Sequence, residues 1–237
     1  MAKQEETAKV QIQEFDINQF KNETLSVFEK YKKIISIVGI SLAVVVGGLL
    51  FYFVGYLGPK EKKASEDLFA AEMYFGRDSF QLALTGRNLT GQQGNFMGLL
   101  DVIKKHGSTK AGNRAYFLAG AALLQTGKFE EAIKYLNKFS SADGLIQAQA
   151  YAMLGDAKSE LNKFPEALDH YLKAAKHFPN DVTTPIHLRK AALLQAEKLG
   201  KPAEALKHLN SIKTDFPKAN PMIINDVDKD IARLSVK

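Results

Sequence analysis

The residues whose spacing most suggests chemistry are three acids near the end of the chain, Asp226-x-Asp228-x-Asp230. Carboxylates at alternate positions open a common type of calcium-binding loop. Such a loop also needs a glycine at its sixth position and a glutamate at its twelfth, and these positions hold Ile231 and Lys237. We therefore predict no calcium site, and we expect the acids to lie at a helix N-terminus, where negative charge complements the helix dipole.

Two other spacings could serve a metal ion or a nucleotide. His170 and His177 are seven positions apart on one predicted helix, too far for a shared zinc ion, and no third ligand accompanies them. Gly86-x4-Gly91 has the spacing of a phosphate-binding loop, but Gln92-Gln93 replaces the required Lys-Ser/Thr and no apolar strand precedes it. No nucleophile, base and orienting acid recur as a recognisable set. The sequence therefore predicts no catalytic residue, no cofactor and no metal, and we expect the protein not to be an enzyme.

The first predicted element of the chain is an apolar segment, Ile34–Leu57. It has 24 consecutive residues without a charge, and lysines lie on both sides of it. A helix needs about 20 apolar residues to cross a bilayer. A cleaved signal peptide has a shorter apolar core, of about 7–15 residues, and Pro59 disfavours cleavage just after this segment. We predict one transmembrane helix at 34–57, preceded by a short polar tail at 1–33.

Charge does not decide the orientation of this predicted span. Four basic residues lie within about 20 positions on each side of it, so the positive-inside rule gives no preference. A single N-terminal anchor usually leaves its short tail inside and translocates the large domain, which is the arrangement we expect. Gly39, Ala43 and Gly47 form a row of small residues, a pattern that often marks helix–helix contact in lipid and would allow self-association. The alternative is that such residues are simply common in spans.

The composition of the rest of the chain fits a soluble domain on a tether. Cysteine is absent, so neither a disulfide nor a thiolate metal site can form. The net charge is +6, and residues 58–237 carry 26 basic and 20 acidic groups. This mild, dispersed positive charge suits an anionic surface or an acidic partner. No arginine-rich run and no basic stripe with interleaved aromatic residues is present, which argues against nucleic acid as a partner.

Residues 58–237 are predicted to be helical throughout and to contain internal repeats. Apolar residues recur at helical spacing, and glycine or proline separates the runs. Units that begin at Asn113, Ala148 and Ile186 fit the tetratricopeptide pattern, a helix–turn–helix of about 34 residues with small and bulky residues at fixed places. The predicted fold is all-α, with one N-terminal transmembrane helix followed by an α-solenoid of tetratricopeptide-like helical hairpins.

Small residues in the repeat pattern mark its turns and its close helix contacts. The first unit has Gly127 at the turn, and the second has Asn162 where glycine is usual. The first and second helices of a unit approach closely, so each needs a small residue at the crossing. The predicted contacts are Gly120 with Ala132 and Gly155 with Ala167.

The repeats are predicted to be capped at both ends, because terminal repeats of a solenoid must cover their apolar face. Residues 58–112 form a linker and degenerate capping helices, 113–219 form three repeats, and 220–237 form a C-terminal capping helix. Within the first of these regions we expect two helices and a polar loop, at Ala64–Phe75, Phe96–His106 and Thr85–Asn95.

A stack of such repeats presents a concave surface lined by the first helix of each unit. The residues that we predict to contact a protein partner there are Arg114, Phe117, Leu124 and Gln125 in the first unit, Gln149, Asp156 and Glu160 in the second, and His187 and Lys190 in the third. Repeat domains of the Hsp70/Hsp90 type hold a peptide carboxylate with Lys and Asn at set positions. The Asn positions here hold Ala121 and Asp156, so that clamp is absent. The mixed groove suits a polypeptide segment better than a small molecule.

The whole layout resembles a known family. Over about residues 20–220 the chain looks like bacterial tetratricopeptide proteins of the ancillary SecYEG translocon subunit type. The segments that carry the resemblance are Phe28-Glu29-Lys30-Tyr31-Lys32-Lys33 before the span, Asp78-Ser79-Phe80-x3-Leu84, Gly112-Asn113-Arg114-Ala115-Tyr116 and Leu154-Gly155-Asp156. The resemblance implies a single-pass bacterial inner-membrane protein with its repeats in the periplasm, associated with the Sec translocon and with a membrane-anchored prolyl-isomerase-like chaperone. It carries over no catalytic residue, and the third unit departs most from the pattern.

Three hypotheses about function follow. The first is a non-enzymatic scaffold that assists Sec-dependent translocation or periplasmic chaperoning by binding the translocon, a chaperone or emerging chains. The second is a structural protein that organises envelope assembly. The third is a cytosol-facing adaptor similar to single-anchored import receptors with repeats.

Overall fold

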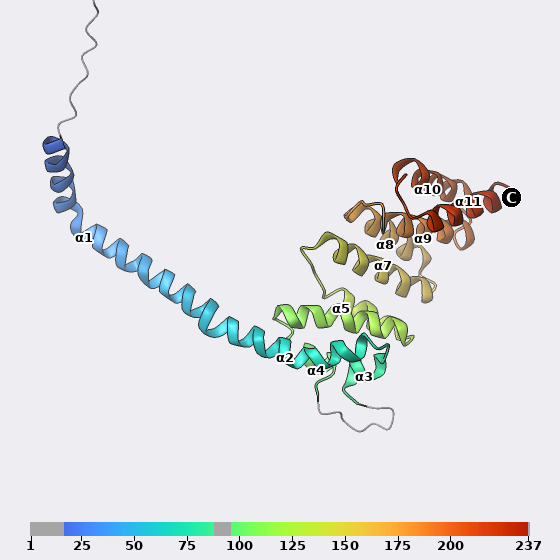
Figure 1. The fold of residues 1–237 in the computed structure, drawn as a ribbon, viewed down its shortest axis with the longest axis horizontal. Coiled ribbons are helices and arrows are strands. Elements are labelled where there is room, and N and C mark those ends of the chain that lie inside the picture. The colour runs from blue at the N-terminus through green and yellow to red at the C-terminus, as the bar shows by residue number, and fades with distance from the viewer. Residues whose placement is uncertain (1–16, 88–95, 237) are drawn as a thin grey trace, which may run out of the picture. The chain divides into compact units, whose positions relative to one another are not determined.

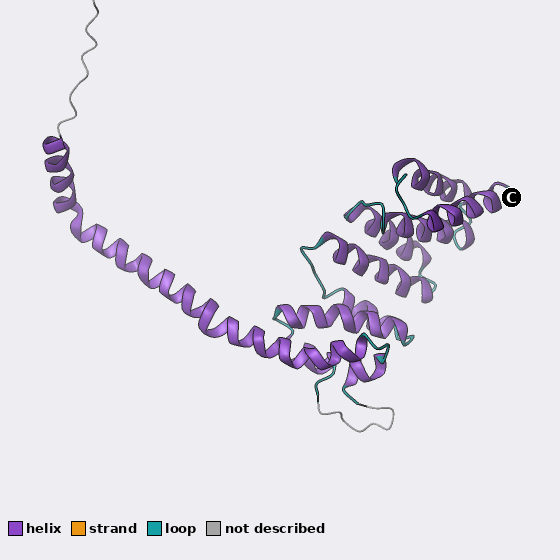
Figure 2. Cartoon of the chain, viewed as in Figure 1, coloured by secondary structure: helices purple, strands orange, loops and turns teal. Residues whose placement is uncertain are grey.

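The computed structural model describes residues 17–87 and 96–236, and every regular element within these residues is a helix (Figures 1 and 2). The predicted all-α class is therefore confirmed. The chain divides into two compact units, Met1–Gly58 and Pro59–Lys237. Of the polar tail predicted at 1–33, residues 1–16 lie outside the described residues, and the rest belongs to the first helix.

The first unit consists of α1 (Ile17–Leu50) and a short π-helical stretch, η1 (Phe51–Leu57). The segment predicted to span a membrane lies in these two elements. Its large apolar side chains are exposed, with Ile37, Val44 and Phe51 at 64%, 68% and 76% of their full accessibility. A helix that is apolar all round needs a non-aqueous environment. This helical stretch is long and apolar enough to cross a membrane.

The second unit is a series of helices in which, from α3 onward, each helix contacts the next (Figure 1). Its helices are α2 (Gly58–Phe75), α3 (Phe80–Thr85), α4 (Leu99–His106), α5 (Lys110–Gln125), α6 (Phe129–Leu136), α7 (Gly144–Glu160), α8 (Phe164–His177), α9 (Thr184–Glu197), α10 (Pro202–Asp215) and α11 (Pro221–Ser235). Contacts between sequence neighbours define an α-solenoid. The hairpins α5–α6, α7–α8 and α9–α10 occupy the region where we predicted the three repeats.

The same backbone conformation recurs at the turn of each hairpin. Gly127, Asn162 and Gly200 follow the first helices of the three hairpins, and their φ angles are 74°, 59° and 64°. This left-handed region costs a residue with a Cβ, and asparagine is among the few that tolerate it. Asn162 therefore occupies the second turn without changing its shape.

The two helices approach closely at a glycine in the first and second hairpins. A Cβ atom on Gly155 would lie 2.6 Å from Cε1 of Tyr171 and 3.2 Å from the carbonyl oxygen of Ala167. A Cβ atom on Gly120 would lie 2.5 Å from Cγ of Leu136, and the nearest atoms there all belong to this leucine. The side chain nearest to Gly120 is thus Leu136, one helical turn beyond Ala132, and the contact of Gly120 with Ala132 itself stays a prediction.

The region that precedes the first hairpin contains three helices where we predicted two. The short helix α3 was not predicted, and α4 begins at Leu99 instead of Phe96. Gly86 ends α3 in the left-handed conformation, with φ at 66°, which only a residue without a side chain adopts easily. In the rejected phosphate-loop motif, Gly91 lies outside the described residues, as does most of the predicted polar loop.

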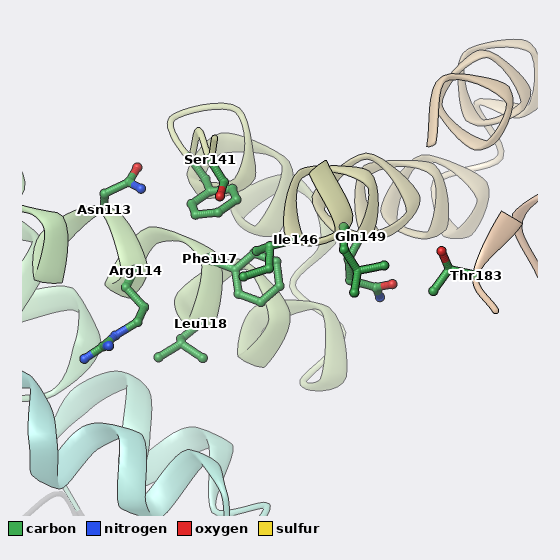
Figure 3. A pocket seen from close by; sticks show the side chains of 10 residues that line it. Asn113, Arg114, Phe117, Leu118, Ser141, Ile146, Gln149 and Thr183 are labelled. Atoms are coloured by element: carbon green, nitrogen blue, oxygen red, sulfur yellow. The ribbon is translucent and has the colours of Figure 1, made fainter. Parts of the chain in front are cut away.

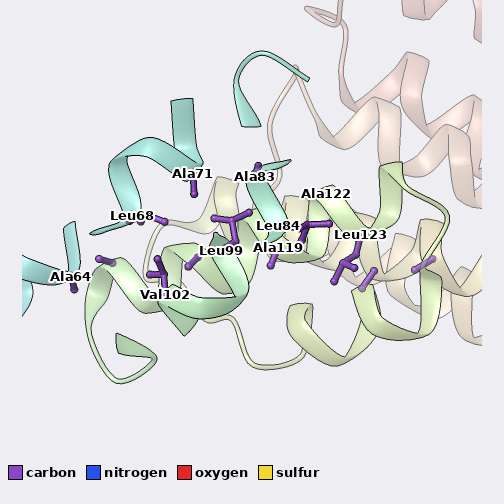
Figure 4. Packing of buried hydrophobic residues seen from close by; sticks show 14 residues of the cluster. Ala64, Leu68, Ala71, Ala83, Leu84, Leu99, Val102, Ala119, Ala122 and Leu123 are labelled. Carbon is purple, nitrogen blue, oxygen red and sulfur yellow. The ribbon is translucent and has the colours of Figure 1, made fainter. Parts of the chain in front are cut away.

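A hydrophobic core holds α2, α3, α4 and α5 together (Figure 4). Its fully buried members are mostly alanine and leucine, including Leu68 on α2, Leu84 on α3, Leu99 on α4 and Leu123 on α5. Each such leucine contributes roughly 1.5–3 kcal/mol of hydrophobic stabilisation. The small alanines between them let the helix backbones approach, as in the hairpins that follow.

Polar contacts also join α2 to the elements that follow it. The carboxylate of Glu61 accepts hydrogen bonds from the backbone N–H groups of Lys110 and Ala111, at 2.9 and 2.8 Å. These are unpaired donors of the first turn of α5, and a carboxylate there also complements the helix dipole. Thr109 accepts a third such bond from the N–H of Gly112. The start of α5 is thus capped by its own threonine and by α2.

The acidic triplet near the C-terminus lies in the middle of α11, so our expectation that it marks a helix N-terminus is wrong. The N-cap of α11 is Asn220. Asp226, Asp228 and Asp230 instead form ion pairs with basic residues of neighbouring helices, because their spacing turns them towards α9 and α10. The pairs are Arg189–Asp230 at 2.7 Å, Arg189–Asp226 at 3.5 Å and Lys213–Asp228 at 2.6 Å.

Candidate protein-binding groove

The first helices of the hairpins, α5, α7 and α9, carry the residues that the repeat pattern predicts to face a concave surface. Helix α5 contacts α7 as well as its own hairpin partner α6. A cavity of about 590 Å³ lies along α5 and α7, and we call it the apolar pocket. Its lining residues are Asn113, Arg114, Phe117, Leu118, Phe139, Ser141, Leu145, Ile146, Gln149 and Thr183.

The floor of the apolar pocket is made of aromatic and branched side chains. Phe117 and Ile146 lie at the middle of the view in Figure 3. The ring of Phe117 packs on that of Phe139, with centroids 5.0 Å apart and planes at 51°. Leu145 and Ile146 are 42% and 41% exposed, which is unusual for large apolar residues so close to one another. The pocket therefore offers a hydrophobic surface that is open to solvent.

Three of the predicted groove residues, Arg114, Phe117 and Gln149, line the apolar pocket. We did not predict Leu145 and Ile146, which lie in the first turn of α7, or Phe139, which follows α6. The repeat pattern predicts groove residues only along the middle of the first helix of each unit, and these three residues lie outside that part. Two bulky apolar residues directly after a helix N-cap, here Asp143, are the signal that would have found the first two.

The polar groups at the edge of the pocket are held in place by other parts of the second unit. The guanidinium of Arg114 pairs with Glu72 of α2, with Nε 2.6 Å from Oε1. The amide of Asn113 donates to the carbonyl oxygen of Ser140 at 2.8 Å and accepts from its N–H at 3.2 Å. These contacts fix the rim before any partner binds, which lowers the entropy cost of binding.

A second hollow, of about 440 Å³, lies at the other end of α5 and α7, and we call it the acidic hollow. Four predicted residues line it, namely Leu124, Gln125, Asp156 and Glu160. The others are Gly127, Phe129, Ser159 and Tyr171. The predicted groove residues of the first two units are thus divided between two sites along the same pair of helices.

Asp156 is the centre of a polar network at the acidic hollow. Lys190 of α9 donates to both of its carboxylate oxygens, at 2.6 and 2.8 Å. The hydroxyl of Tyr171 donates to Oδ1 of the same carboxylate at 2.8 Å. Burial, together with the negative charge of Asp156, raises the pKa of Tyr171, so the hydroxyl keeps its proton and stays a donor. The network joins α7, α8 and α9.

The prediction that His187 contacts a partner is corrected, because its side chain is buried, with 3% exposed. Neither ring nitrogen has a hydrogen-bond partner. Burial, and then the positive charge of Lys190, lower the pKa of His187 from 6.5 to about 4, against a smaller opposing effect of Asp156. The repeat pattern places His187 at a position equivalent to the exposed Arg114 and Gln149, but it contains no information about the side chains of the neighbouring repeat.

The histidine, aspartate and glutamate residues of the second unit are the side chains that could hold a metal ion. Within residues 17–87 and 96–236, no three histidine, aspartate or glutamate side chains come together as ligands for a metal ion. His177 is exposed and stacks edge-on against Tyr151, with ring centroids 5.3 Å apart. His170 is half-buried, and its pKa is lowered by that burial. That the protein is not an enzyme stays a prediction.

The row of small residues predicted for helix contact lies in the first unit. A Cβ atom on Gly39 or Gly47 would meet nothing within 4 Å, and Ala43 is exposed. Space for a second helix is therefore available along this row. The helix–helix contact itself stays a prediction.

The chain was also compared with known proteins. Models of the tetratricopeptide repeat match residues 114–144, 148–181 and 188–219. These segments cover most of the hairpins α5–α6, α7–α8 and α9–α10, and each begins four residues inside the first helix of its hairpin. No curated protein matches this chain.

Proposed function

With three tetratricopeptide repeats as the premise, we propose that this protein is a non-enzymatic, membrane-anchored scaffold that holds a segment of a partner polypeptide in the apolar pocket. Repeats of this type serve as protein-interaction modules, and their stacked first helices form the binding surface. The observation that carries the proposal is the pocket between α5 and α7, with exposed Leu145 and Ile146 beside Phe117.

The chemistry of the apolar pocket favours a polypeptide with a bulky apolar side chain. A fully desolvated aromatic or aliphatic anchor in such a cavity is the usual centre of a protein interface. The rim supplies Arg114, Asn113 and Gln149, which can bond to backbone groups on either side of the anchor. A small metabolite would need convergent polar groups on the floor of the pocket, where apolar side chains lie instead.

The first unit supports the anchoring part of the proposal. Its helix is long and apolar enough to cross a membrane, and its apolar residues are exposed. A single span before a repeat stack restricts the scaffold to work at a membrane surface. The resemblance to ancillary SecYEG subunits favours a bacterial inner membrane, repeats in the periplasm, and the Sec translocon or a membrane-anchored chaperone as partner. An envelope-assembly scaffold and a cytosol-facing adaptor are the other candidates.

A cross-linking experiment tests the proposed groove. A photo-reactive phenylalanine analogue at Ile146 should capture a polypeptide in cells, whereas the same analogue at Lys176, an exposed residue of α8, should not. Captured translocon subunits, emerging chains or a chaperone would support the accessory role. Captured envelope-assembly proteins would support the second candidate. Equal capture from both positions would contradict a specific groove.

The membrane topology needs a separate measurement. A reporter enzyme that is active only outside the cytoplasm, fused after Lys237, should be active if the repeats are translocated. An inactive reporter on a chain that is inserted in the membrane would favour the cytosol-facing adaptor. The test does not depend on the identity of the partner.

Self-association through the first unit is a further part of the proposal. Gly39, Ala43 and Gly47 would let two helix backbones approach closely in lipid. Replacing all three with leucine should keep membrane insertion, because leucine is more apolar, and should lower recovery of a dimer or of a membrane partner. If the variant recovers as much dimer and membrane partner as the unmodified chain, the row of small residues has no role in helix contact and is simply part of the composition of the span.

A further inference from the structure

A basic surface in the second unit joins two segments that are far apart in the sequence. We call it the lysine surface. Its members are Lys60, Lys62 and Lys63 in the first two turns of α2, Lys104 and Lys105 in the last turn of α4, and Lys110 at the start of α5. The ammonium of Lys60 donates a hydrogen bond to Oγ of Ser108, between α4 and α5, at 3.0 Å. This contact brings the start of α2 beside the α4–α5 turn.

Two of the carboxylates in this region already have structural partners. Glu61 caps the start of α5 through two backbone N–H groups. Asp67 accepts from His106 at 2.8 Å, from Lys105 at 3.0 Å and pairs with Lys63 at 3.2 Å. Burial would raise the pKa of Asp67, but these hydrogen bonds outweigh it and hold the pKa at about 2. Both carboxylates are thus held by contacts with other residues of the second unit.

The remaining lysines of the surface are available to a partner. Within the described part of the chain, Lys62, Lys104 and Lys110 form no ion pair, and all three are exposed. The other carboxylates nearby are Glu66 and Asp101, so basic groups outnumber acidic ones. An ammonium on a flexible stem suits a phosphate oxygen that it can meet from several directions.

The place of the lysine surface in the chain suggests the source of the phosphate. Lys60 follows Leu57, the last residue of the apolar segment, by three positions. Three helical residues extend only about 4.5 Å. If Ile34–Leu57 spans a membrane, as the proposed function requires, Lys60 and the α4–α5 turn beside it must lie at the level of the lipid headgroups, whatever the angle between the two units.

We propose that the lysine surface binds the headgroups of anionic phospholipids and so docks the repeat domain on the bilayer through two segments of its chain. The inference rests on the proposed membrane anchor and extends it, because lysines 104, 105 and 110 come from outside the flank of the span. Each lysine near an anionic surface changes the ratio of docked to undocked protein about fivefold, an effect that salt screens. An acidic partner protein is the competing occupant.

The test uses the full chain in nanodiscs of zwitterionic phosphatidylcholine, with or without about a third of anionic phosphatidylglycerol. The chain has no cysteine, so Asp101→Cys provides one site for a fluorophore at an exposed position of α4, and it leaves the contact between Lys60 and Ser108 in place. Quenching by nitroxide-labelled headgroups should be stronger in the anionic discs and should fall at high salt. The triple variant Lys62→Gln/Lys104→Gln/Lys110→Gln should lose this dependence on lipid charge.

A matched control replaces three other exposed lysines that form no ion pair, with Lys176→Gln/Lys207→Gln/Lys218→Gln, and it should quench like the unmodified chain. Equal quenching in both lipids by an inserted chain would overturn the lysine surface while leaving the anchor intact. A chain that does not insert in nanodiscs would overturn the anchor and this proposal together. Loss of an acidic protein partner in the triple variant, without any change in quenching, would assign the surface to that protein.

Discussion

The junction between the first and second repeats differs from the junction between the second and third, although equivalent helices form both. At the first junction, Phe117 and Ile146 leave an apolar cavity of about 590 Å³ along α5 and α7. At the second, Lys190 binds both oxygens of Asp156, and His187 is buried beside them. The surface formed by the first helices is thus open and apolar at the first junction, whereas an ion pair closes it at the second.

If the apolar pocket binds a partner as we propose, the difference means that one junction serves binding and the next holds the repeats together. A bridge such as Lys190–Asp156 uses the side chains that would otherwise contact a partner, and it ties two successive first helices together. The first junction has no ion pair of this kind between α5 and α7 among the described residues, so its surface remains available. We expect changes at the second junction to alter stability and changes at the first to alter binding.

The largest effect that we expect is the response of the second junction to acid. The folded chain keeps His187 neutral until the pH falls to about 4, whereas the unfolded chain takes up the proton below pH 6.5. Above pH 6.5, His187 therefore does not lower the free energy of unfolding. Between pH 6.5 and 4, protonation of His187 in the unfolded chain lowers this free energy by at most about 3 kcal/mol. His187→Gln should remove that part of the decline.

The measurement is urea unfolding of the full chain in a mild detergent, followed by circular dichroism between pH 4 and 7.5. His170 and His208 also have pKa values lowered by burial, so the variant should keep part of the slope. The difference between the two chains isolates His187. Identical slopes would mean that the ring is not held neutral at the second junction.

The next effect in size is overpacking at the crossing of α7 and α8. Gly155→Leu should lower the free energy of unfolding by about 2 kcal/mol, because the ring of Tyr171 is held by Asp156 and cannot move aside. Gly120→Leu is the matched change in the first repeat, where the close atoms belong to the aliphatic side chain of Leu136, which has no hydrogen bond to hold it. Thermal melting of both variants should show the smaller loss in the first repeat, and the reverse order would refute the comparison.

At the first junction we expect a loss of binding. Phe117→Ala should weaken binding of the partner captured at the apolar pocket about tenfold, or about 1.4 kcal/mol, while the helical signal is unchanged. The competing explanation is that Phe117 serves mainly to pack on Phe139. In that case the same variant would melt at a lower temperature and bind normally per folded molecule, so both quantities should be measured on one sample.

The smallest effect should come from the bridge itself. Lys190→Gln removes an ion pair whose side chains are 42% and 26% exposed, so we expect a loss of stability below about 1 kcal/mol. The loss should shrink as salt is added, because exposed charges are screened. Binding at the apolar pocket should stay within about twofold of the unmodified chain. A large loss of binding would show that the two junctions act together.

Periodicity and turn residues were enough to predict the fold class. The apolar spacing within α5 to α10 predicted helices, and Gly127 and Gly200 marked turns whose conformation only a few residues adopt. The short α3 was missed because six residues do not complete a detectable period.

The candidate site was predictable only in part. Phe117 and Gln149 follow from the repeat pattern, because one helix face fixes where they point. The burial of His187 and the bridge from Lys190 to Asp156 depend on how the second and third repeats meet, and no single repeat contains that information. The acidic triplet of α11 was misplaced for the same reason, since its partner Arg189 lies on another helix.

Helix α11 packs on the last hairpin through ion pairs and apolar contacts. A solenoid has no intrinsic stopping point, since each hairpin leaves an apolar face on which another can add. Here α11 covers that face with Val227 and Leu234, and its aspartates form ion pairs with Arg189 and Lys213. We therefore expect α11 to prevent the addition of another hairpin, as a chain terminator stops the growth of a polymer. A protein that ended after α10 would expose Leu209 and Ile212 to other molecules, and light scattering should then detect end-to-end association.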